Sequence, residues 1–318
     1  MKRKNNLYEQ TYELKNIMTV FNEVCRNTRN KKKVRVFKEY KCINISKIYN
    51  TLKNKKYEVG PYNVFTIYEP KERRIVSQNM FDKTINHLVA RYILMPAILP
   101  CLIENNVASR KGKGTKLGLE LHKEYNRICK VKYGTYYILK CDVTKYFASI
   151  DHDILKQKLA RRIKDKDALE IVGKIIDSEE NGLGIGNMTS QVLAIFYLND
   201  MDHYIKEELK IKYYIRYQDD FILLHESKEY LKECLEKIRI FLGKEKLVLN
   251  RKTRIYRDTN NYVFLGRSKK NEYIKYRSCK RKLKGKIYKY RNGYINLNSL
   301  LSSINSYENL TKKKFVIK

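Results

Sequence analysis

Two adjacent aspartates, Asp219 and Asp220, lie between two short apolar segments in the stretch KYYIRYQDDFILLH. The apolar runs on either side predict two strands joined by a tight turn, with both acids at its tip. Burying one carboxylate among apolar side chains is costly, and a second beside it adds like-charge repulsion. Because a divalent cation would balance the pair, the sequence favours a fold in which a β-hairpin presents carboxylates to a metal ion.

A third acid, Asp142, ends another apolar segment, YYILKCD. The chain as a whole has 68 Lys and Arg against 34 Asp and Glu, a formal net charge of +34. Carboxylates at strand ends in so basic a chain indicate metal-assisted phosphoryl chemistry on nucleic acid. The 27 tyrosines could stack on bases. A host whose proteins are generally rich in lysine is the alternative explanation of the charge.

Other kinds of site have little support in the sequence. The seven cysteines are scattered and form no CxxC pair, which argues against a disulfide framework and a zinc knuckle. The five histidines show no metal-binding spacing such as HExxH. The most apolar stretch, LVARYILMPAILPCLI, is too short and interrupted to span a bilayer, and the start shows no signal peptide. We therefore expect a cytoplasmic protein with no membrane partner.

The order of elements predicts an α+β fold. The first hundred residues are expected to be mainly helical, with a basic loop at RNTRNKKKVR and a β-like interruption at YNVFTIYEPKERRIV. From residue 135 onward, strand-like and helix-like segments alternate, which indicates an antiparallel sheet with helices on one face. The last fifty residues are basic and expected to be helical.

Five motifs follow one another in an order and spacing that resemble the reverse transcriptase family, over about residues 57–266. They are the strand ending in Asp142, the turn GIGNMTSQ with Ser190, the YQDD box, Lys252 in LNRKT, and FLG at 264–266. The resemblance implies a right-hand polymerase fold with three parts. These are fingers over 1–134 with a basic hairpin near 62–76, a palm over 135–265, and a small basic helical thumb over 266–318.

The resemblance also implies catalytic roles. Asp142 and Asp219 would be shared ligands of two Mg²⁺ ions, or of Mn²⁺ in their place, with the Val143 carbonyl completing one shell. Asp220 would be an accessory acid at the same metal site. Lys252 would protonate the leaving pyrophosphate, although a surface lysine is an equally good interpretation. Carboxylate oxygens are the ligands that Mg²⁺ prefers.

Further residues are implied to contact the nucleotide, primer and template. In the PKERRI segment Arg73 and Arg74 are favoured for the triphosphate, since a guanidinium can bind phosphate bidentately. Phe147 would exclude a ribose 2′-OH, with a core aromatic as the alternative. The implied nucleotide-binding set is Lys71, Arg73, Arg74, Arg110, Phe147, Ile185, Gly186 and Gln191. The implied primer and template set is Lys113, Ser190, Tyr217, Phe264, Leu265 and Gly266.

The glycine turn departs from the usual family pattern. Ile185 takes the place of a glutamine that lies against the incoming nucleotide, and Gln191 takes the place of a proline. This form is typical of the reverse transcriptases of diversity-generating retroelements, which copy a template RNA with frequent errors opposite adenine. An aliphatic side chain offers no amide hydrogen bonds, so weaker restraint of the nucleotide is a physical reason to expect low fidelity.

The expected partners follow from the same resemblance. They are template RNA, the cDNA primer-template, dNTPs, a structured noncoding RNA and a basic pentameric accessory protein, in a bacterial, archaeal or phage-infected cell. One alternative is an antiphage-defence or other unclassified bacterial reverse transcriptase. An alternative from another class is a non-catalytic RNA-binding protein with a polymerase-like shell. A nuclease using the same acids would leave Phe147 and the cations of the fingers unexplained.

Overall fold

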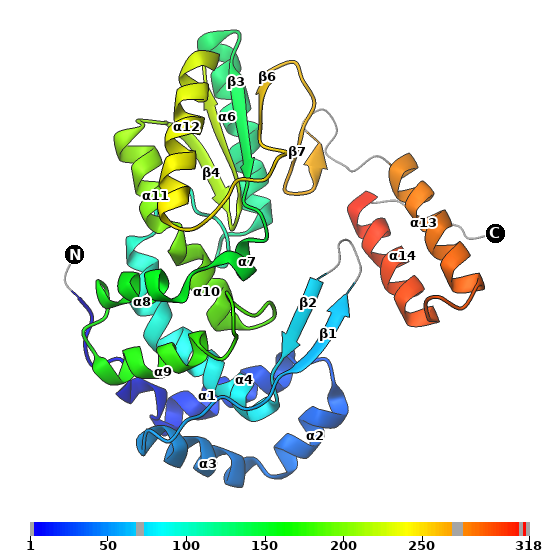
Figure 1. Cartoon of the computed structure of the whole chain (residues 1–318). Helices are drawn as coiled ribbons and strands as arrows, with labels where there is room; N and C mark the ends of the chain where they lie inside the picture. The colour runs from blue at the N-terminus through cyan, green and yellow to red at the C-terminus, as the bar shows by residue number, and fades with distance from the viewer. Residues whose placement is uncertain (1–2, 68–72, 269–275, 312–313, 316–318) are drawn as a thin grey trace.

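A four-stranded antiparallel sheet lies in the upper part of the molecule as drawn in Figure 1. The computed structural model describes residues 3–67, 73–268, 276–311 and 314–315. The strand order is β4-β5-β3-β6. The strands are β3 (Tyr137–Asp142), β4 (Tyr213–Tyr217), β5 (Asp220–His225) and β6 (Arg254–Arg257). The register places Asp142 at the end of β3 directly opposite Asp220 at the start of β5.

Helices cover both faces of this sheet, and the expectation of helices on one face was wrong. Leu139 and Phe221 point into the main core, where α12 (Lys228–Lys244) packs on β3 and β5. Ile138 and Ile222 point to the opposite face, which is covered by α6 (Thr115–Tyr133). The reason lies in runs such as FILL: successive strand residues face opposite sides, so consecutive apolar residues require cover on both.

The N-terminal region is helical, including most of the expected basic loop. It contains α1 (Leu14–Asn27), α2 (Lys31–Glu39), α3 (Lys41–Lys53) and α4 (Met80–Val89). The Asn30 side chain caps α2 by accepting from the Lys33 backbone N–H. Val34 and Phe37, three residues apart, are buried, and Phe37 stacks on Phe21 with ring centroids 4.6 Å apart. The apolar spacing and the cap therefore explain why a helix forms here despite the run of lysines.

The segment expected to be β-like forms a two-stranded hairpin of β1 (Asn63–Ile67) and β2 (Arg73–Ser77). Lys71 lies outside the described residues. Val64, Phe65 and Ile67 of β1 are exposed despite being apolar.

Further helices surround the sheet and fill the region between it and the N-terminal helices. They include α5 (Met95–Ile98), α7 (Tyr146–Ser149), α8 (His152–Ala160), α9 (Lys166–Ile176), α10 (Met188–Tyr197) and α11 (Asn199–His203). A small hairpin, β7 (Val263–Phe264) with β8 (Arg267–Ser268), follows β6. No helix within the described residues is long and apolar enough to cross a membrane.

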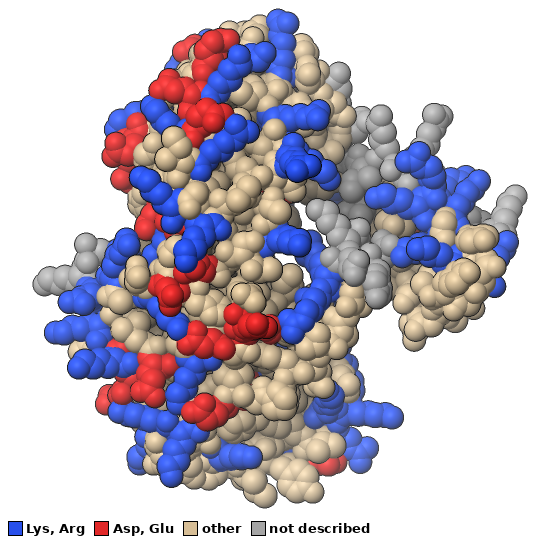
Figure 2. Space-filling model, in the orientation of Figure 1, with Lys and Arg blue, Asp and Glu red and all other residues tan. Residues whose placement is uncertain are grey.

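The C-terminal part is a helical pair, α13 (Tyr276–Arg291) and α14 (Leu297–Thr311). Leu283, Leu300 and Ile304 belong to a small apolar cluster of its own between the two helices. Figure 2 shows lysine and arginine over much of the visible face, including the border of the opening between the main body and this pair. Acidic side chains gather on the opposite side of that view.

Candidate active site

The β4–β5 hairpin brings Asp219 to the end of β3, beside Asp142. Asp142 is near enough to Asp219 for its charge to act on the Asp219 carboxyl group. Burial, together with the charges of Asp142 and Asp220, raises the pKa of Asp219 to about 6. Burial and the two negative charges disfavour the ionised carboxylate, although a backbone hydrogen bond acts in the opposite direction.

Asp220 has different partners from the other two acids. The Lys140 ammonium Nζ lies 2.8 Å from the Asp220 carboxylate oxygen Oδ1. Burial raises the pKa of Asp220, and the charge of Lys140 opposes that shift. The three predicted catalytic acids are therefore arranged as one carboxyl pair and one lysine-bound carboxylate.

The residues at this sheet end fit a divalent cation. Among the described residues, no three His, Cys, Asp or Glu side chains are already gathered as a metal cluster. The Asp142–Asp219 pair nevertheless supplies the hard oxygen ligands suited to Mg²⁺. Hydrogen bonds from Thr144 N to Val248 O (2.9 Å) and from Asn250 N to Asp142 O (2.7 Å) flank Val143. In such antiparallel pairing the intervening Val143 carbonyl points away from residues 248–250, towards the side of β5.

A buried ion pair, absent from the sequence-based prediction, fixes the β4–β5 hairpin. The Arg216 guanidinium binds both carboxylate oxygens of Asp202, with Nε–Oδ1 at 2.7 Å and Nη2–Oδ2 at 2.6 Å. Both side chains are 0% exposed. Arg216 also donates to the carbonyls of Ile195 (2.8 Å) and Gln218 (2.9 Å). An arginine within the apolar strand YYIRY was the signal that could have revealed it, since a buried charge requires a partner.

The glycine turn joins the segment of Phe147 to β2. Gly182 has φ +65°, and a Cβ there would overlap the Phe147 carbonyl oxygen, which accepts from Leu183 N at 2.7 Å. The Ile185 carbonyl accepts from Val76 N in β2 at 3.0 Å. Gly186, with φ +130°, has room for no Cβ because the Val76 carbonyl lies against it. The turn therefore needs glycine at both positions.

The other residues around the turn that were predicted to contact the nucleotide differ in how far they are buried. Phe147 is half-buried and packs against the main core, with its ring centroid 5.9 Å from that of Tyr146. Ile185 is half-buried and Gly186 exposed. In α10, Ser190 is buried and Gln191 is exposed.

Some predicted phosphate-binding cations are engaged with protein groups. Arg74 forms an ion pair with Glu179 at 2.8 Å, whereas Arg73 is exposed at the start of β2. Arg110 donates to the Ile103 carbonyl at 2.8 Å. Lys113 binds the carboxylate of Glu104 at 2.6 Å, so Arg110 and Lys113 both hold the loop at 103–106. A role for Arg110 and Lys113 in touching template or nucleotide stays a prediction.

The β7–β8 turn lies next to the acids. Phe264 is buried, and Leu265 and Gly266 have φ +48° and +76°, as in the tight hairpin turns that match strand twist. Tyr217, at the end of β4, is half-buried and contacts both apolar clusters of the sheet. Lys252 is exposed, two residues after Asn250, whose backbone is bound to Asp142.

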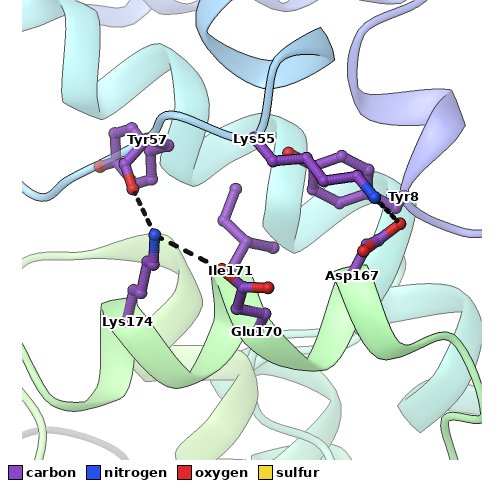
Figure 3. A pocket seen from close by; sticks show the side chains of 7 residues that line it. All are labelled: Tyr8, Lys55, Tyr57, Asp167, Glu170, Ile171 and Lys174. Atoms are coloured by element: carbon purple, nitrogen blue, oxygen red, sulfur yellow. Dashed lines mark hydrogen bonds and ion pairs between the residues drawn. The ribbon is translucent and has the colours of Figure 1, made fainter.

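A separate shallow hollow lies between α9 and residues 55–57 (Figure 3). Lys55 and Asp167 form an ion pair across it at 2.7 Å. Lys174 binds the Tyr57 carbonyl at 3.2 Å and Glu58 at 2.7 Å. These contacts fasten α9 to the segment after α3, and none of the predicted site residues lies there.

Comparison with known proteins decides the family. Residues 31–268, most of the chain, match the model of the family described as reverse transcriptase (RNA-dependent DNA polymerase). The chain belongs to the reverse transcriptase family. No curated protein matches its sequence. The prediction of that family is thereby confirmed at the level of the family.

Two solved telomerases share its fold. Apo telomerase from Candida tropicalis, truncated from the C-terminal domain, has 17% identity and a TM-score of 0.50, over 69% of this chain and 56% of that one. Telomerase from Candida albicans in complex with the TWJ fragment of telomeric RNA has 14% identity and a TM-score of 0.50, over 75% and 49%. The chain thus spans about half the length of these structures. The right-hand polymerase fold is confirmed.

Proposed function

We propose that this reverse transcriptase is an RNA-directed DNA polymerase that copies a template RNA into cDNA. The observation that carries the proposal is the strand register that brings Asp142, Asp219 and Asp220 to one end of the sheet, in a chain of this family. The charge of Asp142 contributes to the raised pKa of Asp219, and a cation bound between the two acids would offset that repulsion.

Each residue of the site has a part in nucleotidyl transfer. Asp142 and Asp219 would hold Mg²⁺, with the Val143 carbonyl as a further oxygen ligand. When bound, the metal ions supply Lewis-acid chemistry for an in-line displacement at phosphorus. Arg73, exposed on β2, would bind triphosphate oxygens, and Lys252 would donate a proton to the leaving pyrophosphate.

RNA is the nucleic acid that the proposal assigns as template and partner. One of the similar telomerases was solved with a fragment of telomeric RNA. This chain has a formal net charge of +34, and cations border the opening between the main body and the helical pair (Figure 2). A basic surface of this kind favours a phosphate backbone over neutral partners.

The finer proposal is error-prone synthesis in a diversity-generating retroelement. Its support is Ile185, whose backbone is fixed on β2 by the Val76 hydrogen bond. The aliphatic side chain at that position has no amide to offer a nucleotide or base. A template repeat with adenine-limited variation beside the gene would support this function, whereas an antiphage role requires no such repeat.

Primer extension on an RNA template with Mg²⁺ and dNTPs tests the polymerase. We expect wild-type protein to extend the primer and Asp219→Asn to reduce the rate by about 10³ or more, since several kcal/mol of transition-state stabilisation are lost. Asp167→Asn, which removes an acid of the hollow in Figure 3, is the matched control and should retain activity. No extension by the wild type, or equal extension by Asp219→Asn, would reject the proposal.

A further inference from the structure

Lys158, on α8, is a buried lysine that binds residues of three other elements. Its side chain is 3% exposed. The ammonium Nζ lies 2.8 Å from Glu245 Oε1, just beyond α12, and 3.2 Å from Asp200 Oδ2 in α11. It also donates to the Tyr197 carbonyl at the end of α10, at 2.8 Å. A buried ammonium is tolerated only with such partners, so Lys158 joins α8 to α11 and to the ends of α10 and α12.

Two further contacts hold the residues that follow α12. The Tyr197 hydroxyl donates to the Glu245 carbonyl at 2.7 Å. Lys246 Nζ lies 2.6 Å from Oδ2 of Asp151, the residue that caps α8. Lys246 has φ +56°, a conformation that glycine commonly adopts just beyond a helix. Together with Lys158, these residues form an anchor that fixes the end of α12 to α8.

The segment 246–252, which we call the linking segment, leads from the anchor along the end of β3. The Val248 carbonyl accepts from Thr144 N at 2.9 Å, and Asn250 N donates to the Asp142 carbonyl at 2.7 Å. The linking segment is therefore paired with the backbone that carries the first catalytic acid. A displacement of the anchor would be passed along this pairing to the active site.

We propose that Lys158 and Tyr197 are positioning residues, which hold the linking segment in register with the end of β3 and so set the places of Asp142 and Lys252. The inference rests on the proposed function, in which Asp142 and Lys252 take part in nucleotidyl transfer. Lys158 and Tyr197 are both buried, so they act through the linking segment and touch no substrate.

The chemistry of the anchor suits a positioning role. Apolar side chains in place of a buried charge cluster often leave stability unchanged or raise it, so stability alone does not call for the charges. Hydrogen bonds with a charged donor or acceptor instead restrict distance and angle. Three hydrogen bonds of 2.6–2.8 Å reach Glu245 and Lys246 at the start of the linking segment. Such precision matters to catalysis, because misplacement of reacting groups by about 1 Å can slow a reaction about 10²-fold.

Full-length variants with a matched control test the inference. Tyr197→Phe keeps the ring and removes the hydroxyl that binds the Glu245 carbonyl. Tyr8→Phe is the control, because the Tyr8 hydroxyl also donates to a backbone carbonyl, that of Leu52, at 2.7 Å, between buried residues that have no contact with the linking segment. Lys158→Met removes the ammonium, and if it fails to fold, Tyr197→Phe still decides.

Two readouts separate positioning from a general loss of stability. The first is hydrogen exchange of the Thr144 and Asn250 amides in metal-free protein, and the second is the split between kcat and KM in primer extension. We expect Tyr197→Phe to speed exchange of both amides about threefold to tenfold and to lower kcat by a similar factor, with KM for primer–template changed by less than about twofold. Lys158→Met should have larger effects, and Tyr8→Phe should leave both readouts as in the wild type.

Two results would overturn the inference. One is unchanged exchange and unchanged kcat in Tyr197→Phe. The other is an equal change of both readouts in Tyr8→Phe, which would assign the effect to stability alone. If the wild type extended no primer, the proposed function would fail, whereas the exchange rates, measured without metal or nucleotide, would still support or reject the anchoring of the linking segment.

Discussion

Asp219 is strained electrostatically in the absence of a cation, and this has a measurable consequence. In the folded protein the pKa of Asp219 is raised to about 6, whereas in the unfolded chain this side chain ionises above about pH 4. Ionisation of Asp219 at higher pH therefore destabilises the folded state. Removing the charge should therefore stabilise the metal-free fold above pH 6. We expect Asp219→Asn in EDTA at pH 8 to raise the free energy of unfolding by about 1–2 kcal/mol, measured by urea denaturation.

Measuring the stability of the same variant at different pH values and with added Mg²⁺ provides the controls. The gain should shrink as the pH falls from about 6 towards 4 and vanish below it, where the Asp219 carboxyl group is protonated in both the folded and the unfolded state. Added Mg²⁺ should stabilise the wild type and not Asp219→Asn. A variant less stable than the wild type at pH 8 would contradict the expected repulsion.

Ile185 allows a direct test of fidelity. Ile185→Gln restores an amide to a turn whose backbone is already fixed on β2. We expect fewer misincorporations opposite adenine, by about threefold to tenfold if one hydrogen bond is regained, measured by sequencing cDNA copied from a defined RNA. Ile185→Leu, which adds no polar group, is the matched control. Equal error rates in the wild type and both variants would show that the side chain at position 185 does not control fidelity.

At the scale of elements, the β4–β5 hairpin depends on the buried pair of Arg216 and Asp202. Replacing one partner leaves the other charge buried and alone, which costs about 3–5 kcal/mol. We expect Arg216→Met to lower the free energy of unfolding by that amount and to abolish extension. The double variant Arg216→Met with Asp202→Leu should recover part of the stability, and a fully additive loss would argue against coupling.

Helix α4 should make the fold sensitive to acid. Burial, with the charges of Lys83 and Arg91, lowers the pKa of His87 from 6.5 to about 4, although Glu23 acts in the opposite direction. Between pH 6.5 and pH 4, His87 is protonated in the unfolded chain but neutral in the folded protein. The free energy of unfolding therefore falls as the pH drops through this range. His87→Gln should reduce that fall by about 1–3 kcal/mol in urea titrations at pH 7 and pH 4.

The elements also show what sequence patterns can predict. The apolar runs beside Asp142, Asp219 and Asp220 predict that these acids lie at strand ends, and the structure puts them at one sheet end. The family and the fold followed from the order of such motifs. The run of lysines indicated a basic loop where helix α2 forms, because it outweighed the helical spacing of Val34 and Phe37.

Long-range pairings were beyond the sequence patterns. Arg216 and Asp202 meet only after β4 and α11 fold together. Whether Asp220 faces Lys140 or Asp219 depends on strand register, which a local pattern does not specify. The need for cover on both sheet faces is written in the consecutive apolar residues of FILL, whereas the alternation of helix and strand alone does not say on which face each helix packs.

For the whole molecule, charge sets the response to salt. With a net charge of +34, RNA binding should weaken steeply as salt rises. The slope of log affinity against log salt should be about −0.7 for each single-strand phosphate neutralised and about −0.9 for each duplex-DNA phosphate. Filter binding across a range of KCl concentrations measures it. A flat response would contradict a mode of binding dominated by phosphates.

The β1–β2 hairpin has a practical consequence for handling the protein. Val64, Phe65 and Ile67 are exposed on a two-stranded sheet whose outer edges have no further strand among the described residues. Such strands pair readily with copies of themselves. Purified protein stripped of nucleic acid should therefore self-associate on concentration, and co-purification with an oligonucleotide should extend its shelf life.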